Sequence, residues 1–174
     1  MATQLWFTAD THFGHTNIIR YCQRPFDDVE HMDESLIANW NAVVKPGDLV
    51  WHLGDFSFAE PSRYLTRLNG TIHLCFGNHD SRWRSLLTHS SLASTCDVRW
   101  LRWQKQRIFL SHYAHREWPK AHHGSWHLFG HSHGDLPDHG RSTDVGVDCW
   151  NYRPVNFDEI HERLTARELV PHHA

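Results

Sequence analysis

The stretch LWFTADTHFGHTN, residues 5–17, contains the features that decide the fold. It begins with the apolar run Leu5–Thr8, which predicts a buried strand. The chain then passes into Asp10 and His12, where a turn residue is usual. In layered α/β proteins, functional side chains gather at the carboxyl ends of strands, because loops converge there over a rigid sheet. The stretch therefore predicts an α/β fold with a site at the end of its first strand.

Four other predicted strands end in side chains of the same kind. They lie within DLVWHLGD (48–55), within TIHLCFGNHD (71–80), over residues 107–112 and over residues 126–129. The polar side chains at their ends are Asp55, Asn78 and His79, His112, and His131 and His133. One such ending could arise by chance, but five endings built from Asp, Asn and His favour a common site.

The remaining predicted elements alternate with these strands along the chain. Apolar residues at helical spacing, among them Met32, Leu36 and Trp40, predict a helix over residues 29–44. Further helices are expected over residues 61–68, 82–88 and 157–168, a hairpin strand over residues 98–103, and a late strand over residues 144–149. We find no internal repeat and no linker, so we expect a single domain over residues 1–174.

Composition restricts the class of protein. The formal net charge is −3, so bulk charge alone does not indicate binding to nucleic acid or to an anionic membrane. The four cysteines are widely spaced and form no C-x-x-C pair, which favours free thiols in a reducing compartment. We see no signal peptide and no apolar run of the ~18 residues that a membrane helix needs. The sequence therefore predicts a cytoplasmic protein with no membrane partner and no obligate protein partner.

Histidine is unusually frequent, with 18 copies against 17 lysines and arginines together. Scattered histidines are expected to be solvated surface residues; these are His31, His89, His161, His172 and His173. His52 and His73 lie inside predicted strands and are expected to be hydrogen-bonded core residues. The histidines at strand ends are different, because neutral imidazole is the commonest metal ligand.

The strand-end residues have the chemistry of a metal site. Seven of them are candidate ligands: Asp10, His12, Asp55, Asn78, His112, His131 and His133. Carboxylate, amide and imidazole ligands without thiolates suit Mn²⁺, Fe²⁺, Co²⁺, Ni²⁺ or Zn²⁺. A single tetrahedral zinc ion uses about four ligands, so seven favour two ions that share a carboxylate. Two such ions can bind both the attacking and the leaving oxygens of a displacement at phosphorus.

The motifs occur in the order D-x-H, G-D, G-N-H-D, a single His after a strand, and G-H-x-H, from Asp10 to His133. This series resembles the calcineurin-like metallophosphoesterase superfamily. The segments FTADTHFGHTNIIRYCQRPF and TDVGVDCWNYRPVNFDEI also resemble a branch of small, capless bacterial and phage phosphoesterases. The resemblance implies a four-layer αββα sandwich, with two mixed sheets flanked by helices and the site on loops at one edge.

The resemblance also implies roles for individual residues. The first metal ion would be held by Asp10, His12 and His133, and the second by Asn78, His112 and His131. Asp55 would bridge the two ions, and a hydroxide shared by them would be the nucleophile. His79 would act on the leaving-group oxygen as a general acid or hydrogen-bond donor, and Asp80 would orient it. We expect Mn²⁺, with Fe, Zn, Ni and Co as alternatives.

Residues near the motifs are candidates for further contacts. Those that could reach a substrate phosphate are His15, Arg20, Arg24 and His115. For each of them the alternative is an ordinary loop or solvated residue. Asp144 and Asp148, on the predicted late strand, could accept hydrogen bonds from the metal-binding histidines.

The expected activity is hydrolysis of phosphate esters, with phosphodiesters favoured. A chain of 174 residues leaves no room for a capping domain, so an open cleft is expected that admits cyclic nucleotides, nucleotide diesters or nucleic-acid ends. One alternative is a Mn²⁺-dependent DNA or RNA nuclease that uses Trp100, Arg102 and Trp103. Another is a non-catalytic binding scaffold, although the intact motifs argue against it.

Overall fold

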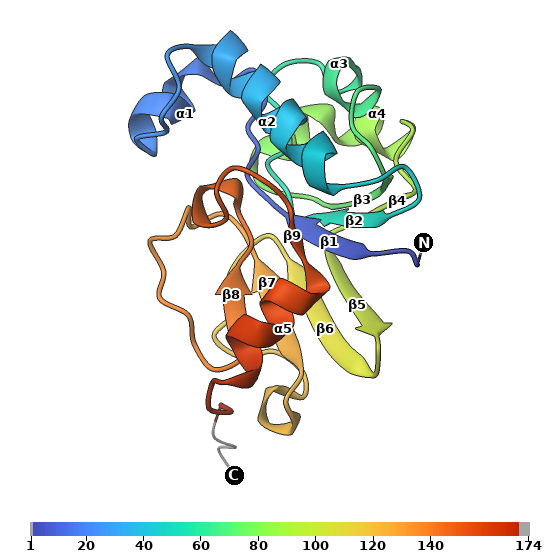
Figure 1. Ribbon diagram of the computed structural model, residues 1–174, viewed down its shortest axis with the longest axis vertical. Coiled ribbons are helices and arrows are strands. Elements are labelled where there is room, and N and C mark those ends of the chain that lie inside the picture. The colour runs from blue at the N-terminus through green and yellow to red at the C-terminus, as the bar shows by residue number, and fades with distance from the viewer. Residues whose placement is uncertain (1, 171–174) are drawn as a thin grey trace.

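The computed structural model describes residues 2–170, which form two β-sheets and several short helices (Figure 1). The first sheet has the strand order β4-β3-β2-β1-β9. Its strands are β1 (Leu5–Thr8), β2 (Leu49–His52), β3 (Thr71–Cys75), β4 (Ser94–Cys96) and β9 (Val155–Asn156). Strands β1 to β4 run parallel, and β9 is antiparallel to β1. The first sheet is therefore mixed.

The second sheet has the order β5-β6-β7-β8. Its strands are β5 (Val98–Trp103), β6 (Gln106–Ser111), β7 (Trp126–Phe129) and β8 (Ser142–Asp144). Strands β5 and β6 form an antiparallel hairpin, whereas β6, β7 and β8 run parallel. Both sheets thus contain parallel strands whose carboxyl ends carry the polar motifs.

The helices are short apart from α2. They are α1 (Thr16–Tyr21), α2 (Val29–Val43), α3 (Ser62–Leu65), α4 (Arg84–Thr88) and α5 (Phe157–Thr165). Three 3₁₀ turns are η1 (His79–Trp83), η2 (Ala121–His123) and η3 (Val147–Cys149). Figure 1 shows α2, α3 and α4 over the first sheet and α5 beside the second sheet. Helix α5 begins at a capping box, in which Asn156 and Glu159 each accept a backbone N–H at its first turn.

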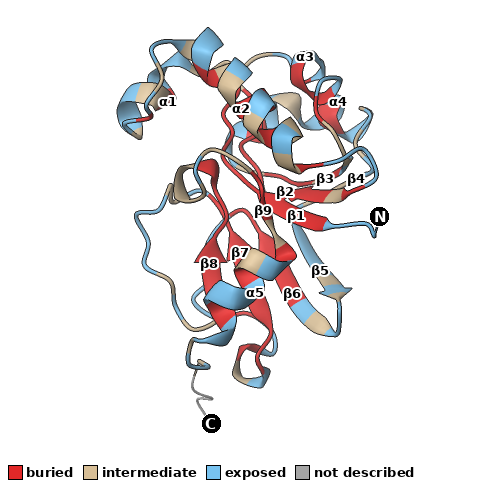
Figure 2. Cartoon of the chain, viewed as in Figure 1, coloured by how far each residue is buried: buried red, intermediate tan, exposed pale blue. Residues whose placement is uncertain are grey.

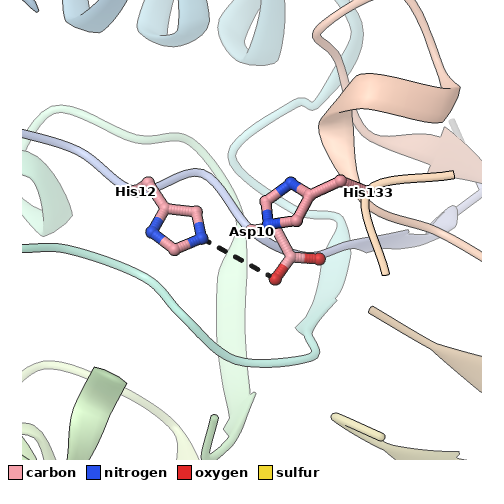
Figure 3. Close-up of side chains that lie close together, drawn as sticks. All are labelled: Asp10, His12 and His133. Atoms are coloured by element: carbon pink, nitrogen blue, oxygen red, sulfur yellow. Dashed lines mark ion pairs between the residues drawn. The ribbon is translucent and has the colours of Figure 1, made fainter. Parts of the chain in front are cut away.

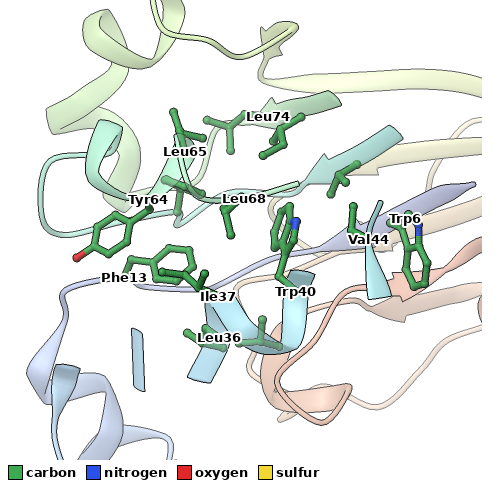
Figure 4. Packing of buried hydrophobic residues seen from close by; sticks show 14 of the residues in the cluster. Trp6, Phe13, Leu36, Ile37, Trp40, Val44, Tyr64, Leu65, Leu68 and Leu74 are labelled. Atoms are coloured by element: carbon green, nitrogen blue, oxygen red, sulfur yellow. The ribbon is translucent and has the colours of Figure 1, made fainter. Parts of the chain in front are cut away.

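One hydrophobic core lies between the first sheet and helices α2 to α4 (Figure 4). Its largest fully buried side chain is Trp40 of α2, which lies with Leu36 and Ile37 of the same helix. Trp6 of β1 and Val50 of β2 face this helical layer. Because side chains alternate along a strand, Leu5 and Phe7 point to the opposite face of the sheet.

A second core lies between the two sheets. Leu5 and Phe7 of β1 pack there with Trp126 and Leu128 of β7. Helix α5 joins this core, where Phe157 stacks on Trp126 with ring centroids 5.0 Å apart. The central strands β1 and β2 of the first sheet are consequently covered on both faces, as Figure 2 shows in red, whereas β4 at the edge is only partly buried. This arrangement confirms the expected α/β fold with two mixed sheets and helices.

The outer face of the second sheet is covered by a loop with one 3₁₀ turn, and not by a layer of α-helices like the first sheet. Phe109 of β6 packs there against Trp118 and Ala121. These two residues belong to the connection between β6 and β7, in which the helical structure is the single turn η2. Trp118 also donates its indole N–H to the carbonyl of Ser125, which closes this connection on itself.

Most predicted elements are confirmed, with two corrections. The late strand predicted over residues 144–149 is wrong, because β8 ends at Asp144 and residues 147–149 form η3. The Asp144 carboxylate folds back to accept the N–H of Gly146, which favours a turn. The helices predicted over residues 61–68 and 157–168 are shorter than predicted, and span Ser62–Leu65 and Phe157–Thr165. The sequence did not predict α1, β4 or β9, which have six, three and two residues.

Histidines outside the motifs mostly follow their predictions. His31, His89 and His161 are exposed, whereas His172 and His173 lie outside the described residues. His52 is buried and hydrogen-bonds to Thr11, and His73 hydrogen-bonds to Ser94. Within the described residues, no helix is both long and apolar enough to cross a lipid bilayer. The single domain and the cytoplasmic location stay predictions.

Candidate metal centre

The first group of candidate ligands contains Asp10, His12 and His133 (Figure 3). Asp10 and His12 follow β1, and His133 follows β7. The potential ligand atoms of these three residues all lie within 4.8 Å of one another. Nε2 of His12 is 4.0 Å from Oδ1 of Asp10, and both side chains are almost completely buried. The group thus combines residues that are more than 120 positions apart in the chain.

The second group contains Asp55, His112 and His131. Nε2 of His112 lies 3.5 Å from Oδ2 of Asp55 and 2.9 Å from Oδ1 of Asn78. His112 is buried, whereas Asn78 and His131 are exposed. The Nδ1 of His112 is 2.7 Å from the carbonyl of Leu53, which leaves Nε2 facing the group.

Asp55 lies between the two groups. Its Oδ2 is 3.7 Å from Nε2 of His12 and 3.5 Å from Nε2 of His112. Its Oδ1 accepts the backbone N–H of His79 at 2.9 Å, which fixes the carboxylate in this orientation. One carboxylate is therefore in reach of both groups.

The backbone at the strand ends turns sharply. Five of the seven candidate ligands have positive φ: Asp10, His12, Asp55, His131 and His133. Asp, Asn and His enter this left-handed region more readily than most residues, but each such residue still costs on the order of 1 kcal/mol. Left-handed residues concentrate at functional sites, so their occurrence at five ligands points to function rather than to folding alone.

Two glycines of the motifs permit close packing at the carboxylates. A Cβ atom on Gly77 would clash with the carboxylate of Asp55. A Cβ atom on Gly130 would lie 2.6 Å from Oδ2 of Asp10. Glycine is thus required beside both carboxylates, which explains why Gly precedes Asn78 and His131 in the sequence.

Burial dominates the electrostatics of the first group. It raises the pKa of Asp10 to about 8 and lowers the pKa of His12 to about 2. Oδ1 of Asp10 and both ring nitrogens of His12 are buried without a hydrogen-bond partner. Buried polar atoms are rarely left unpaired in proteins, because desolvation is costly. A divalent cation would satisfy Oδ1 of Asp10 and the Nε2 of His12 that faces it, so the residues fit a metal ion.

Mutual pairing dominates the second group. Burial alone lowers the pKa of His112, but the hydrogen bond with Asp55 and the charges of Asp10 and Asp55 raise it to about 9. Burial alone raises the pKa of Asp55, but His112 and the N–H of His79 lower it to about 2. In the metal-free protein, His112 therefore carries a proton where a metal ion would bind.

Comparison with known proteins identifies the family. The model of the calcineurin-like phosphoesterase superfamily domain matches residues 4–143. The chain belongs to the calcineurin-like phosphoesterase superfamily. An uncharacterised protein of Methanocaldococcus jannaschii is 34% identical over 179 residues, which cover 96% of this chain and 94% of that protein. The gene 66 protein of Mycobacterium phage L5 is 28% identical over 90% of this chain and 92% of its own length.

Solved structures share the fold of this phosphoesterase family member. A protein of unknown function from Aquifex aeolicus has a TM-score of 0.73 and 26% identity, with coverage of 93% of this chain and all of that one. A novel archaeal phosphodiesterase has a TM-score of 0.50 and 17% identity over 83% of this chain and 82% of its own. The fold expected from the sequence motifs is thus shared with known structures.

A buried ion pair supports the first group of the phosphoesterase site. Nδ1 of His133 lies 2.7 Å from Oδ2 of Asp148, which orients the ring so that Nε2 remains for a metal ion. Arg24 donates two hydrogen bonds of 2.8 Å to the Asp148 carboxylate and further ones to the carbonyls of Asp10 and Thr11. The side chain of Arg24 has no exposed surface. It therefore cannot contact a phosphate here, which corrects that expectation.

Asp144 supports the loop between His131 and His133 rather than a ligand imidazole. Its Oδ2 accepts hydrogen bonds from the Ser132 hydroxyl and from the N–H of Gly134. The expected contact with a metal-binding histidine is thus present for Asp148 and replaced by a loop contact for Asp144.

Asp80 binds backbone instead of His79. Its two oxygens accept the N–H groups of Asp55, Phe56 and Gly77 at 2.7–2.9 Å. These bonds tie the loop after β2 to the loop after β3. Among the described residues, no hydrogen bond joins Asp80 to the His79 ring, and the role of Asp80 in orienting His79 stays a prediction. His79 itself is half-exposed, with Nε2 3.9 Å from Oδ2 of Asp55.

Phe58 is a member of the site that the sequence did not reveal. Its ring stacks on His15 with centroids 3.7 Å apart and an interplanar angle of 12°. It also lies 4.9 Å from the His79 ring and 5.6 Å from the His12 ring. His15 therefore lies at the site. Its ring packs on Phe58, and its ring centroid is 5.5 Å from that of His12.

The other two candidate substrate contacts lie at the margin. Arg20 is exposed on α1, with its guanidinium 5.3 Å from the Tyr21 ring. The ring of His115 packs against Phe109 and His127, and the backbone N–H of His115 donates a hydrogen bond to Nε2 of His127. Within the described residues, neither Arg20 nor His115 has a recorded contact with the two ligand groups.

A third group of potential ligands shares residues with the first. It consists of Cys22, His133 and Asp148. Burial raises the pKa of the Cys22 thiol to about 11, so that it stays protonated at neutral pH. His133 and Asp148 are already hydrogen-bonded to each other. This group is therefore part of the support for the first metal site and not a separate one.

Proposed function

We propose that this protein is a dinuclear metal-dependent phosphodiesterase. The observation that carries the proposal is the position of Asp55, whose Oδ2 lies within 3.7 Å of His12 and 3.5 Å of His112. A carboxylate in reach of two separate ligand groups is suited to hold two cations together. Phosphoester hydrolysis is the chemistry for which such pairs are commonly used.

We propose that the ligands divide between the two ions as follows. The first ion would be held by Asp10, His12 and His133, the second by Asn78, His112 and His131, and both by Asp55. When bound, two divalent ions supply Lewis acidity to the phosphate and lower the pKa of a water molecule. We propose Mn²⁺, because the donors are carboxylate, amide and imidazole without thiolate.

We assign His79 to the leaving group. It is half-exposed beside Asp55, so that a substrate can approach its ring from solvent. Its backbone N–H is fixed by Asp55, and its ring is supported by Phe58. In this position the imidazole can donate a proton to the departing alkoxide, which is the usual contribution of a general acid.

The exposure of the second group favours diesters. Asn78, His79 and His131 are all exposed, so that side of the site is open to solvent. A phosphodiester carries a group on each side of the phosphorus atom and needs such room. An open site also admits the ends of larger molecules.

A nuclease that uses the β5 edge strand is the weaker alternative. Trp103 packs into the core between the sheets, and Trp100 is 39% exposed but packs on Phe109 with centroids 5.4 Å apart. These rings are therefore occupied within the protein. A steep loss of oligonucleotide hydrolysis with rising salt would favour the nuclease, because phosphate contacts release counterions.

The test is hydrolysis of bis-p-nitrophenyl phosphate by the metal-depleted protein after addition of Mn²⁺. We expect turnover that depends on the metal and exceeds turnover of p-nitrophenyl phosphate. An absence of turnover on both substrates and on oligonucleotides, with Mn²⁺ bound, would contradict the proposal and favour a non-catalytic scaffold.

A further inference from the structure

A cavity of about 430 Å³ is lined by segments that adjoin proposed metal ligands in the chain. Four of its lining residues are apolar, Ala114, Phe129, Leu136 and Pro137, and four are polar, His115, Arg116, His139 and Ser142. We call this space the side cavity. Its volume falls in the range of small-molecule binding sites, and a mostly apolar wall with a few polar groups is typical of them.

The side cavity is close to the metal centre along three separate segments. Ala114 lies two residues after His112, Phe129 two residues before His131, and Leu136 three residues after His133. Since successive Cα atoms are about 3.8 Å apart, these residues lie within roughly 12 Å of a proposed ligand. A group attached to a phosphate at the metal centre can span such a distance.

The apolar wall is not explained by folding. Leu136 is 49% exposed on the loop after the G-H-S-H motif, and Pro137 follows it. A large apolar side chain held at the surface beside a functional site commonly marks a binding surface. Phe129 also lines the side cavity, although it is only 2% exposed. The exposed apolar side chains therefore favour an occupant with an apolar part.

The polar lining favours an occupant that also carries negative charge. Arg116 lines the side cavity and is exposed, and no acidic side chain is among the lining residues. Arg116 has no recorded ion pair with any part of the chain that the structure describes. A guanidinium group of this kind is suited to bidentate contact with a phosphate.

We propose that the side cavity binds one nucleotide unit of the phosphodiester substrate. The base lies against Leu136 and Pro137, and Arg116 contacts a phosphate of the same unit. This inference rests on the proposed function and adds to it the class of the organic group. The unit can belong to a small nucleotide diester or to the end of a nucleic acid, since both present the same chemistry.

The first experiment measures binding rather than turnover. Calorimetric titration of the Mn²⁺-loaded protein compares adenosine 5′-monophosphate with ribose 5-phosphate, which lacks the base. We expect the nucleotide to bind about tenfold more tightly, the order that contact of a base with an apolar wall provides. Equal affinities would overturn the proposal.

Two variants localise the effect. Leu136→Asp should remove the preference for the nucleotide, and Ala114→Trp should remove it by filling the side cavity without adding charge. The control is Leu86→Asp on α4, because Leu86 is 44% exposed and thus closely matches Leu136. A preference that survives both cavity variants, in proteins with wild-type melting temperatures, would contradict the proposal. Arg116→Gln should lower the affinities for adenosine 5′-monophosphate and ribose 5-phosphate by the same factor, so that the preference for the nucleotide remains.

Turnover separates this inference from the proposed function. Hydrolysis of bis-p-nitrophenyl phosphate without a nucleotide preference would leave the function standing and reject the side cavity. Absence of hydrolysis would reject the function, while the binding comparison still reports on the cavity. A dinucleotide and an oligonucleotide of about 20 nucleotides distinguish a small diester substrate from the end of a nucleic acid. Leu136→Asp should lower kcat/KM only for the one of these two substrates that the side cavity binds.

Discussion

The two halves of the proposed metal centre differ in how they meet solvent. In the first half, Asp10 and His12 are 0% and 2% exposed, and His133 is held from behind by Asp148 and Arg24. In the second half, His112 is buried but Asn78 and His131 are exposed. The ligands of the first half are therefore mostly buried and held by hydrogen bonds from behind, whereas two ligands of the second half face solvent.

The halves differ in charge as well. Burial keeps His12 neutral and leaves its ring nitrogens without partners, whereas His112 is already paired with Asp55 and Asn78. An ion must displace a proton from Asp10 in the first half and from His112 in the second, but only the first half also offers buried atoms that have no hydrogen-bond partner. We therefore expect the first ion to bind more tightly and the second to exchange and to face the substrate.

The largest effect is expected from Asp55→Ala, which removes what the two halves share. The second ion should be lost, the first weakened, and activity reduced below detection. Metal analysis of the dialysed protein checks this result, with wild type prepared in parallel. Retention of both ions with normal turnover would show that Asp55 does not join the halves.

His79→Ala should separate chemistry from metal binding. His79 belongs to neither ligand group, so the metal content should be unchanged. Loss of a general acid is expected to lower kcat by about 10²- to 10⁴-fold. An undiminished kcat for bis-p-nitrophenyl phosphate would exclude this role, and a lower metal content would place His79 among the ligands.

Asp148→Asn should affect the first half alone. It weakens the hydrogen bond that orients His133, and changes of this kind typically cost about 10- to 100-fold in metal affinity. Competition with a chelator measures the two affinities. The matched control is Asp138→Asn, because Asp138 also pairs with arginines, Arg163 and Arg167, but contacts no proposed ligand. Equal effects of the two substitutions would argue against a specific role for Asp148.

Metal affinity should rise with pH. In the metal-free protein the pKa of His112 is about 9 and that of Asp10 about 8, so both carry a proton near pH 7 that a metal ion must displace. For each proton displaced, the affinity should fall about tenfold per pH unit below the pKa. Mn²⁺ titrations at pH 6, 7 and 8 check this dependence. Equal affinities at pH 6 and pH 8 would contradict it.

The same shifts affect the stability of the metal-free protein. The raised pKa of His112 stabilises the fold below about pH 6.5, and this contribution is lost as pH rises toward 9. The raised pKa of Asp10 lowers stability as pH rises from about 4 to 8. Mn²⁺ should therefore increase the melting temperature more at pH 8 than at pH 6.

The smallest effect is expected from Phe58→Leu, which removes an aromatic contact with His15 and His79. Aromatic pairs contribute about 0.5–1.5 kcal/mol, which corresponds to at most about a tenfold decrease in kcat. Phe58→Tyr should retain most activity because it keeps the ring. If leucine and tyrosine behave alike, the ring does not position His79.

The sequence predicted the parts of this protein that depend on local pattern. The residues of the two candidate ligand groups could be predicted because each follows an apolar strand, and strand ends meet at one edge. The contact of Arg24 with Asp148 could not, because these residues are 124 positions apart and no local pattern links them. Strands β4 and β9 were missed because three and two residues are too few to show alternation. The segment DVGVDC alternates like a strand, yet it turns at Gly146.

Anomalous diffraction from crystals of the Mn²⁺-loaded protein would locate the metal ions themselves. We predict two manganese peaks, one contacted by Asp10, His12 and His133 and the other by Asn78, His112 and His131, with Asp55 contacting both. The second peak should weaken first when the crystals are transferred to buffer without metal. A single peak at saturating Mn²⁺, or two peaks that do not share Asp55, would contradict the account.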